Sequence, residues 1–198
     1  GDVDSIARLL EMIARREGIG DTLAEGIRHA AQSWGLEEIA VHVKGLEPAG
    51  YDPRPLKGMG LAYGTSDRGA CHLRATFYKP ELSGMVPAGQ IEGKAELFLE
   101  FESRLTVFDT LILCRFYRDY YTWGKLGEIL HLVTGLDAGE QALKKRALNV
   151  ADLIRRFNIR EGMKSKDDLL PSFLHKPLKD TGKVITTTEM EALLKDSY

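Results

Sequence analysis

The stretch from Ile91 to Tyr121, IEGKAELFLEFESRLTVFDTLILCRFYRDYY, decides the fold class of this chain. Its apolar side chains recur at intervals of three and four residues, which is the pattern of an α-helix that buries one face. We therefore expect a single helix from Ile91 to about Tyr121. The side chains available for burial are Leu97, Phe98, Phe101, Leu105, Phe108, Leu111 and Ile112.

Helical spacing also occurs on both sides of this stretch, and only Ala40 to Lys44 alternates as a short strand would. The sequence therefore predicts an all-α, multihelical fold with two packed helical subdomains and a long Gly/Pro-rich loop. We expect further helices at Asp4–Glu17, Asp21–Trp34, Leu126–Thr134, behind the cap signal Asp137–Glu140, and from Thr188 with Glu191 completing a capping box.

Between Gly45 and Gly69 the character of the sequence changes. Six glycines and three prolines occur in this segment, which is too rich in helix breakers for a long regular element. Long irregular loops inside compact domains usually carry function. We therefore expect the main site in this segment and at its exit.

Composition excludes several classes of protein. The 198 residues carry 27 basic and 29 acidic side chains, so no strong positive field is available to attract nucleic acid or an anionic membrane. No apolar run approaches the roughly 18 residues of a membrane helix. Two isolated cysteines predict no disulfide framework and favour a reducing, cytoplasmic location. The start at Gly1, without methionine, favours a piece of a longer polypeptide.

The loop exit, Arg68-Gly-Ala-Cys-His-Leu-Arg74, combines residues suited to ligand binding. Glycine allows close approach of the backbone, arginine supplies forked donors for anions, and His72 can transfer protons near neutral pH. The alternative is a solvated loop with one structural histidine. Because Cys71 and His72 are adjacent in sequence, we do not expect a cysteine hydrolase.

Two more motifs combine reactive groups. Tyr51-Asp-Pro-Arg54 is a proline-stiffened turn that presents a phenol and an arginine, although a buried structural tyrosine would look the same. Asp109 and Cys114 place a carboxylate and a thiol at the two ends of a short apolar run. A free cysteine among aromatic residues is more often a small core residue.

Taken in order, seven stretches resemble the aldehyde ferredoxin oxidoreductase family, the tungsten or molybdenum bis-pterin enzymes. The resemblance covers nearly the whole chain. The stretches are Gly20–Gly26, His42–Glu47, Tyr51–Arg54, Gly58–Tyr63, Arg68–His72, Asp109–Cys114, and Arg160–Gly162 with Lys166–Asp168.

The resemblance implies roles for individual residues. Asp109 and Leu113 match a pterin-binding motif, and Cys114 matches the cysteine that closes it and ligates a [4Fe-4S] cluster. Ile112 stands where that motif has glycine. His72 matches a histidine beside the metal, and Tyr51 matches a tyrosine on the substrate side. We add Arg68 as a cofactor-binding residue, because its guanidinium suits an anionic group.

The resemblance also implies an activity and an architecture. Members oxidise aldehydes to carboxylic acids with a tungstopterin and a [4Fe-4S] cluster, and pass the electrons to ferredoxin. Residues 1–45 would be a remnant of the middle helical domain, and residues 46–198 the C-terminal helical domain. An N-terminal domain with the other three cluster cysteines should precede Gly1.

Because that domain is missing here, we expect this fragment alone to bind neither cofactor and to be inactive. Leu111, Leu113 and Phe116 should belong to an apolar patch that the missing domain covers, and such a patch can also support a homodimer.

Two other functions remain open. The chain could belong to a related tungsten-dependent aromatic-ring reductase subunit of the benzoyl-CoA type. It could also be a non-catalytic helical binding module derived from the family. A zinc protein is disfavoured because no ligands stand at zinc spacing.

Overall fold

The computed structural model describes residues 1–197, and the predicted all-α fold is confirmed there. Within these residues, the only bridge between extended backbones is an isolated one that joins Val43 and Leu46. The α-helices are α1 (Val3–Arg15), α2 (Ile19–Ala24), α3 (Ile27–Trp34), α4 (Lys57–Thr65), α5 (Tyr78–Leu82), α6 (Lys94–Thr110), α7 (Trp123–Thr134), α8 (Glu140–Arg160) and α9 (Thr187–Ser197). The short 3₁₀ helices are η1 (Arg115–Tyr117), η2 (Ser165–Asp168) and η3 (Ser172–His175).

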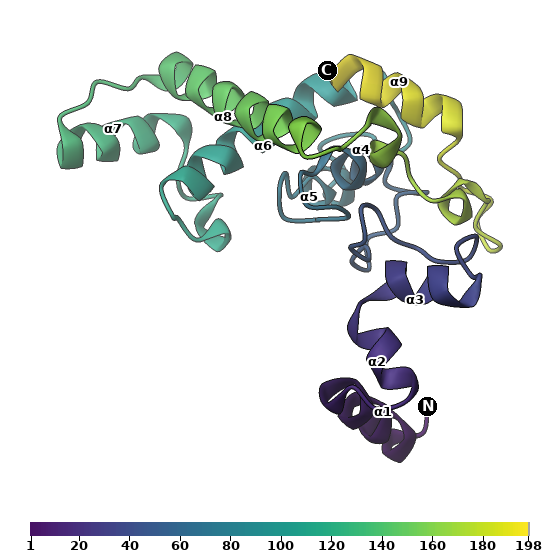
Figure 1. Ribbon diagram of the computed structural model, residues 1–198. Coiled ribbons are helices and arrows are strands. Elements are labelled where there is room, and N and C mark those ends of the chain that lie inside the picture. The colour runs from purple at the N-terminus through teal and green to yellow at the C-terminus, as the bar shows by residue number, and fades with distance from the viewer. Residues whose placement is uncertain (198) are drawn as a thin grey trace.

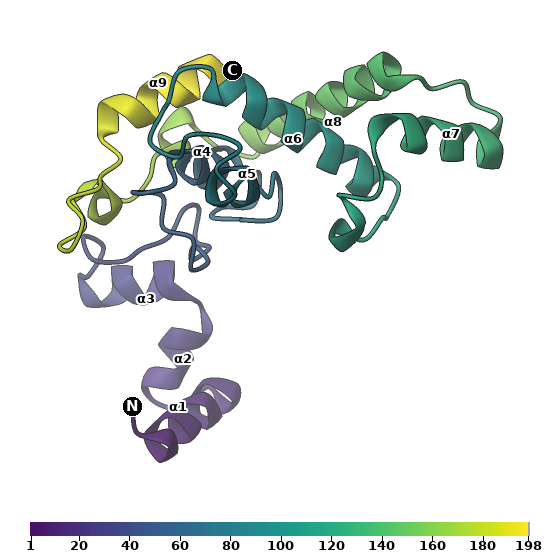
Figure 2. The same cartoon turned by 180° about the vertical axis from the view of Figure 1, so that it is seen from behind.

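Two hydrophobic cores organise the molecule. The main core surrounds α4 and draws on α6, α9 and the segments that flank α4, whereas the second core lies between the end of α6, α7 and the start of α8. Figures 1 and 2 show α1 and α2 projecting below this body, with α7 at its side. In the part of the chain that the structure describes, no helix combines the length and the apolar character needed to cross a membrane.

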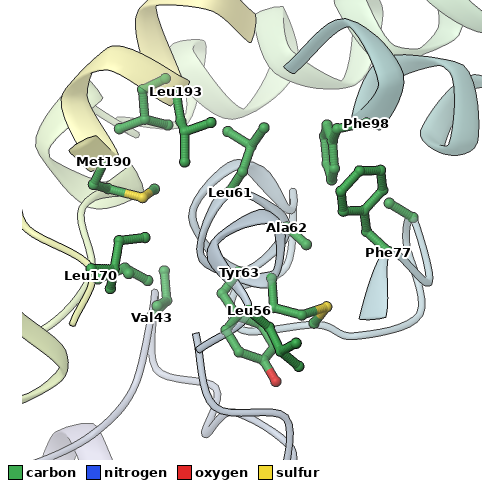
Figure 3. Packing of buried hydrophobic residues seen from close by; sticks show 14 of the residues in the cluster. Val43, Leu56, Leu61, Ala62, Tyr63, Phe77, Phe98, Leu170, Met190 and Leu193 are labelled. Atoms are coloured by element: carbon green, nitrogen blue, oxygen red, sulfur yellow. The ribbon is translucent and has the colours of Figure 1, made fainter. Parts of the chain in front are cut away.

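Helix α4 lies at the centre of the main core, although the sequence predicted an irregular loop between residues 45 and 69 (Figure 3). Every residue from Gly58 to Gly64 is buried. The glycines that argued against a helix are the positions where neighbours approach most closely. A Cβ added at Gly60 would lie 2.5 Å from the Ile185 side chain, and one at Gly64 would lie 2.5 Å from the backbone oxygen of Asp168.

The N-terminus of α4 is capped from another helix by a buried ion pair. The Glu81 carboxylate accepts hydrogen bonds from the backbone N–H groups of Gly58 (2.8 Å) and Met59 (3.2 Å). It also pairs with Lys94 at 2.6 Å, and both side chains are almost completely buried. The Lys94 ammonium donates further to the carbonyl oxygens of Pro87 (3.0 Å) and Ala88 (3.4 Å), so this buried charge is well satisfied.

The long helix predicted to reach Tyr121 ends at Thr110, because the chain turns into a left-handed conformation at Ile112 (φ 57°). The Ile112 N–H donates to the Asp109 carbonyl (3.1 Å) and the Leu113 N–H to the Phe108 carbonyl (2.8 Å). This bonding pattern is a Schellman motif, in which glycine is the usual residue at the left-handed position. The predicted continuation is therefore wrong beyond Thr110.

The helices at the N-terminus differ from prediction in two ways. Asp2, rather than Asp4, caps α1 by accepting from the backbone N–H groups of Asp4 (3.3 Å) and Ser5 (3.2 Å). The helix expected from Asp21 to Trp34 is interrupted at Gly26 (φ 86°), which separates α2 from α3. Trp34, at the end of α3, is 45% exposed.

The C-terminal helices α8 and α9 form where the sequence predicted them, but the capping residues of α9 differ from the prediction. Helix α8 begins at Glu140 and buries Leu143 and Ala147, whereas Phe157 on the same helix is 54% exposed. The capping box of α9 uses Thr186 and Glu189, two residues earlier than expected. The Thr186 N–H donates to Glu189 (2.9 Å), and the Glu189 N–H donates to the Thr186 hydroxyl (3.2 Å).

Candidate functional site

The loop exit after α4 and the turn after α6 line one hollow of about 460 Å³. Arg68 and Arg74 come from the loop, and the turn supplies the rest of the wall from Asp109 to Arg115. Three guanidinium groups thus face one carboxylate, and we call this space the cationic hollow. Its charge and its size suit an anionic ligand.

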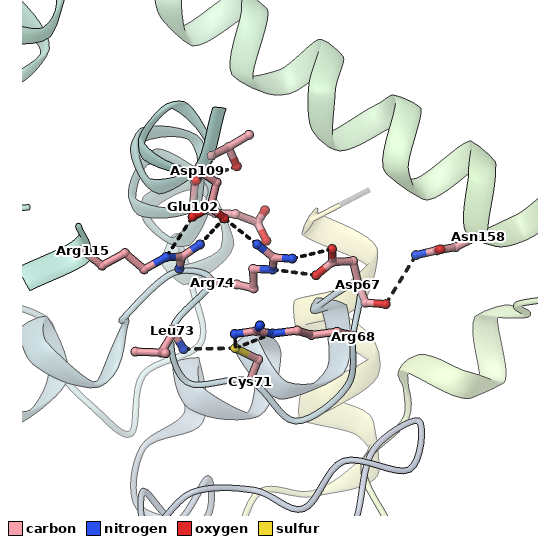
Figure 4. A network of polar contacts seen from close by, with 10 residues as sticks. Asp67, Arg68, Cys71, Leu73, Arg74, Glu102, Asp109, Arg115 and Asn158 are labelled. Atoms are coloured by element: carbon pink, nitrogen blue, oxygen red, sulfur yellow. Dashed lines mark hydrogen bonds and ion pairs between the residues drawn. The ribbon is translucent and has the colours of Figure 1, made fainter. Parts of the chain in front are cut away.

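A chain of ion pairs fixes the arginines of the cationic hollow (Figure 4). Arg74 donates to Asp67 through two nitrogens (2.7 and 2.8 Å) and reaches Asp109 at 2.5 Å. Arg115 also pairs with Asp109, through Nε (3.0 Å) and through Nη2. Asp109, predicted to bind a pterin, therefore already accepts from two arginines. A carboxylate offers about four lone-pair positions, so a further donor can still be accepted.

Cys71 holds the third arginine of the hollow in place. Its buried sulfur accepts hydrogen bonds from Arg68 Nη2 (2.9 Å), Arg68 Nε (3.2 Å) and the Leu73 N–H (3.3 Å). Figure 4 shows the Arg68 guanidinium lying against this sulfur. Cys71 thus ties Arg68 to the backbone of the loop.

Cys114 differs from Cys71 in being exposed, at the edge of the cationic hollow. The Schellman turn at Ile112 directs the chain so that Leu113 packs on the second core and Cys114 faces out. Phe116, Leu111 and Leu113 were expected in one uncovered apolar patch. Phe116 is 88% exposed, and Leu111 and Leu113 are partly buried because they pack against the second core.

The residues present fit the groups that the sequence implied. An exposed thiol suits an iron ligand, and the arginines suit an anionic cofactor. In the described residues, the Arg115 Nη1 atom is buried without a hydrogen-bond partner, so one donor of this wall is unused. Residues 1–197 contain no group of three or more His, Cys, Asp or Glu arranged to hold a metal ion.

His72 and Tyr51 lie together in an aromatic group that adjoins the cationic hollow. The Tyr51 ring stacks on Tyr78 with centroids 4.0 Å apart, and His72 lies 5.7 Å from Tyr51. The Tyr63 hydroxyl donates to the Tyr51 carbonyl (2.9 Å), which ties this turn to α4. Partial burial, followed by the charge of Arg68, lowers the pKa of His72 and favours a neutral imidazole at pH 7.

The structure thus groups the six predicted site residues into two adjoining sets. Arg68, Asp109, Leu113 and Cys114 line the cationic hollow, whereas Tyr51 and His72 do not line it. Sequence reasoning assigned no role to Tyr78 or Arg115. Tyr78 gave no local signal, and the only signal for Arg115 was its position next to Cys114.

Comparisons with known proteins extend over the same residues. The family description "Aldehyde ferredoxin oxidoreductase, domains 2 & 3" matches residues 1–198. The tungsten-containing aldehyde ferredoxin oxidoreductase of Pyrococcus furiosus is 31% identical over 204 residues, which covers 100% of this chain and 34% of that protein. The protein of the same name from Thermococcus kodakarensis is 31% identical over 96% of this chain and 33% of its own length. The chain thus spans about a third of the length of these relatives. From these matches, the chain belongs to the aldehyde ferredoxin oxidoreductase family.

Proposed function

We propose that this chain forms one wall of the cofactor site of an enzyme that oxidises aldehydes and passes the electrons to ferredoxin. One observation carries the proposal: Arg68 from the loop and Asp109, Leu113 and Cys114 from the end of α6 line the same hollow. These four residues were selected from sequence alone, and they come from two distant segments. The names of the relatives, aldehyde ferredoxin oxidoreductases, support the substrate class and the electron acceptor.

Each residue of the cationic hollow has a role in this proposal. The Cys114 thiolate would ligate one iron of a [4Fe-4S] cluster, which takes its other three ligands from elsewhere in the protein. Arg68 and Arg115 would bind the anionic part of the pterin through charge-assisted hydrogen bonds. Asp109 would accept from pterin N–H groups while it holds Arg74 and Arg115 in place.

The neighbouring aromatic group would act on the substrate. Oxidation of an aldehyde consumes water and yields a carboxylic acid, two protons and two electrons. The tungstopterin, when bound, supplies the two-electron acceptor for this reaction. His72 would take the proton of the attacking water, because its lowered pKa leaves a free ring nitrogen at pH 7. The Tyr51 hydroxyl would donate a hydrogen bond to the carbonyl oxygen.

The proposed domain division places residues 1–45 in a middle helical domain and residues 46–198 in a C-terminal one. The projection of α1 and α2 from the body is consistent with separate contacts for the first part (Figure 1). The division passes through the bridge between Val43 and Leu46, and Val43 belongs to the main core. The two parts therefore share some of their packing.

We propose that the chain is part of a longer polypeptide, as its coverage of a third of its relatives suggests, and the test uses that longer polypeptide, purified without oxygen. We expect Cys114→Ser to lower the iron content and to change the electron paramagnetic resonance signal of the cluster. We expect Asp109→Asn to lower the tungsten content and aldehyde-dependent reduction of ferredoxin together. Asp119→Asn is the matched control, because Asp119 is an exposed residue that pairs with Lys79 outside the hollow.

Normal iron and tungsten contents in both variants would overturn the proposed roles of Cys114 and Asp109. Reduction of an aromatic acyl thioester in place of aldehyde oxidation would select the ring-reductase alternative. Residues 1–198 alone are expected to bind no stoichiometric tungsten or iron and to oxidise no aldehyde. Stoichiometric metal in that sample would contradict this expectation.

A further inference from the structure

A second cavity, of about 500 Å³, lies between α6 and α8 and adjoins the cationic hollow. The two spaces have Arg74 and Asp109 in common. Most of the wall of this second cavity is apolar, with Phe98 and Leu99 from α6 facing Leu148 and Ile154 from α8. Such a volume with a few polar groups is typical of a small-molecule site.

Glu102 is the unusual group of this cavity. Within residues 1–197, its carboxylate makes no hydrogen bond or ion pair, and Figure 4 shows it beside the Arg74–Asp67 pair without a connection to either. The three other carboxylates of the wall are all paired. Their partners are Arg74 for Asp67 (2.7 Å) and Asp109 (2.5 Å), and Arg156 for Asp152 (2.8 Å).

The hydroxyl groups of the wall add acceptors rather than donors. Thr106 donates to the Glu102 carbonyl (2.9 Å), Thr110 to the Thr106 carbonyl (2.8 Å) and Thr65 to the Leu61 carbonyl (2.9 Å). A hydroxyl has a single hydrogen to donate, so these groups offer a ligand only oxygen lone pairs. The other donors of the wall are already engaged: Arg74 pairs with Asp67 and Asp109, Arg155 pairs with Asp168 (2.6 Å), and Asn158 donates to the Asp67 carbonyl (3.4 Å). Among the described residues of the wall, Glu102 therefore remains the carboxylate without a hydrogen-bonded donor, although Arg74 lies near it.

We propose that this cavity binds an alkyl ammonium group, with the cation at Glu102 and the carbon chain against the apolar walls of α6 and α8. An ammonium carries three donors and no acceptor, which complements the polar atoms of the wall. The chemistry is the same for a free primary amine and for a lysine side chain of the longer polypeptide. The site is independent of the proposed redox function.

The protonation of Glu102 supports this assignment. Burial, with the charge of Asp67 as a second cause, raises the pKa of Glu102 to about 7, and Arg74 acts in the opposite direction. The other charged groups around the cavity are Asp109 on α6 and Asp152 and Arg155 on α8. Because an ammonium favours the ionised carboxylate, its binding must lower the pKa of Glu102 and must strengthen as the pH rises from 6 to 8.

The experiment uses residues 1–198 and n-hexylammonium as the probe, followed by NMR titration at pH 8. We expect saturable shifts at residues of α6 and α8, and at least tenfold weaker binding by Glu102→Gln. Hexanoate has the same chain with the opposite charge and should not bind. Asp152→Asn is the matched control, because Asp152 lies in the same wall but already pairs with Arg156. Circular dichroism and melting temperatures establish that both variants are folded.

A second measurement follows the carboxyl carbon of Glu102 across the pH range. With n-hexylammonium at ten times its dissociation constant, the midpoint should fall by about one pH unit. Equal binding of hexanoate, unchanged affinity in Glu102→Gln, or an unmoved midpoint would each overturn the proposal.

The same probe applied to the longer polypeptide distinguishes the two sources. Retained binding identifies a free amine as the ligand. Lost binding with a lowered Glu102 midpoint identifies a lysine side chain in the cavity. Lost binding with the midpoint still near 7 would contradict the proposal.

Discussion

Ile112 holds the backbone turn that carries Leu113 and Cys114 to the cationic hollow. Its φ of 57° is a conformation that β-branched residues rarely adopt, and its side chain is 91% exposed. Left-handed backbone costs an L-residue roughly 1–2 kcal/mol. The two hydrogen bonds of the Schellman motif and the packing of Leu113 on the second core compensate for this strain. The turn therefore persists although the residue is not glycine.

Ile112→Gly should stabilise the protein. Glycine removes the strain of about 1–2 kcal/mol. It also increases the conformational entropy of the unfolded chain, which destabilises the folded state by about 0.5–1 kcal/mol. We expect the free energy of unfolding to rise by roughly 0.5–1 kcal/mol, measured by urea denaturation. Ile112→Val is the control and should change little, since it keeps the branched Cβ. A less stable glycine variant would show that the exposed Ile112 side chain contributes more than the strain.

Glu102 makes the stability of the folded chain dependent on pH. Its folded pKa of about 7 lies above the usual value of 4.5, so the folded state binds the extra proton. The sign follows from linkage: this contribution is complete below pH 4.5 and is lost as the pH rises through 7. Glu102→Gln removes this contribution. The variant should gain up to ~3 kcal/mol relative to the parent at pH 8 and little at pH 4.5.

Urea unfolding at both pH values measures this difference. Asp152→Asn again serves as the control, because Asp152 has a counterion and is expected to shift neither value. An equal effect of Glu102→Gln at pH 4.5 and pH 8 would mean that burial does not penalise the charged form. Free amines must be absent from the buffer, since the proposed ligand would remove part of the penalty.

Helix α4 is the element that the sequence predicted least well, because a loop was expected in its place. Glycine is unfavourable by about 1 kcal/mol inside a helix, so local rules argue against a helix at Gly58, Gly60 and Gly64. The compensation comes from residues far away in sequence. Phe77, Ile185 and the Asp168 backbone occupy the space that side chains on this helix would need. Local patterns contain no information about such contacts.

Gly64→Ala and Gly124→Ala should have opposite effects, although both positions are helical. A Cβ at Gly64 would lie 2.5 Å from the Asp168 backbone oxygen, which can move only if the main chain shifts. We expect a loss of roughly 1–3 kcal/mol from this overpacking. A Cβ at Gly124 in α7 meets nothing within 4 Å, so this variant should gain about 0.5–1 kcal/mol.

The melting temperatures of the two variants measure the contrast, with unfolding followed by circular dichroism. If Gly64→Ala proved as stable as the parent, α4 would have freedom to move away from η2, and the tight packing described for the main core would be wrong.

The resemblance to a known family, rather than local chemistry, indicated the candidate site. It assigned roles to Asp109 and Cys114, which remain predictions, and the structure shows that both line one hollow with Arg68. The division of the predicted site into a cationic hollow and an aromatic group was not recognisable. It depends on the turn at Ile112 and on the stacking of Tyr51 with Tyr78, and both are set by packing rather than by periodicity.

At the scale of the whole molecule, α6 connects the two cores. Ala95 and Phe98 near its start belong to the main core, and Leu105 and Phe108 near its end belong to the second core. The cationic hollow and the cavity between α6 and α8 both use residues of the C-terminal half of this helix. A substitution that disturbs α6 should therefore change both the stability of the protein and the geometry of the two cavities.

Helices α1 and α2 take no comparable part in this arrangement. Helix α1 buries none of its side chains, and it packs mainly on α2, where the buried Gly20 lies against the backbone of Met12. Neither helix contributes a residue to either core.

Removal of residues 1–25 should therefore change the melting temperature of the remainder by no more than ~4 °C, which corresponds to less than about 1 kcal/mol. The control is removal of residues 1–46, which also deletes Val43 from the main core and should destabilise the protein severely. If the shorter deletion abolished cooperative unfolding, α1 and α2 would belong to the same folding unit as the body. They would then stabilise the body through α3, although they project from it in Figure 1.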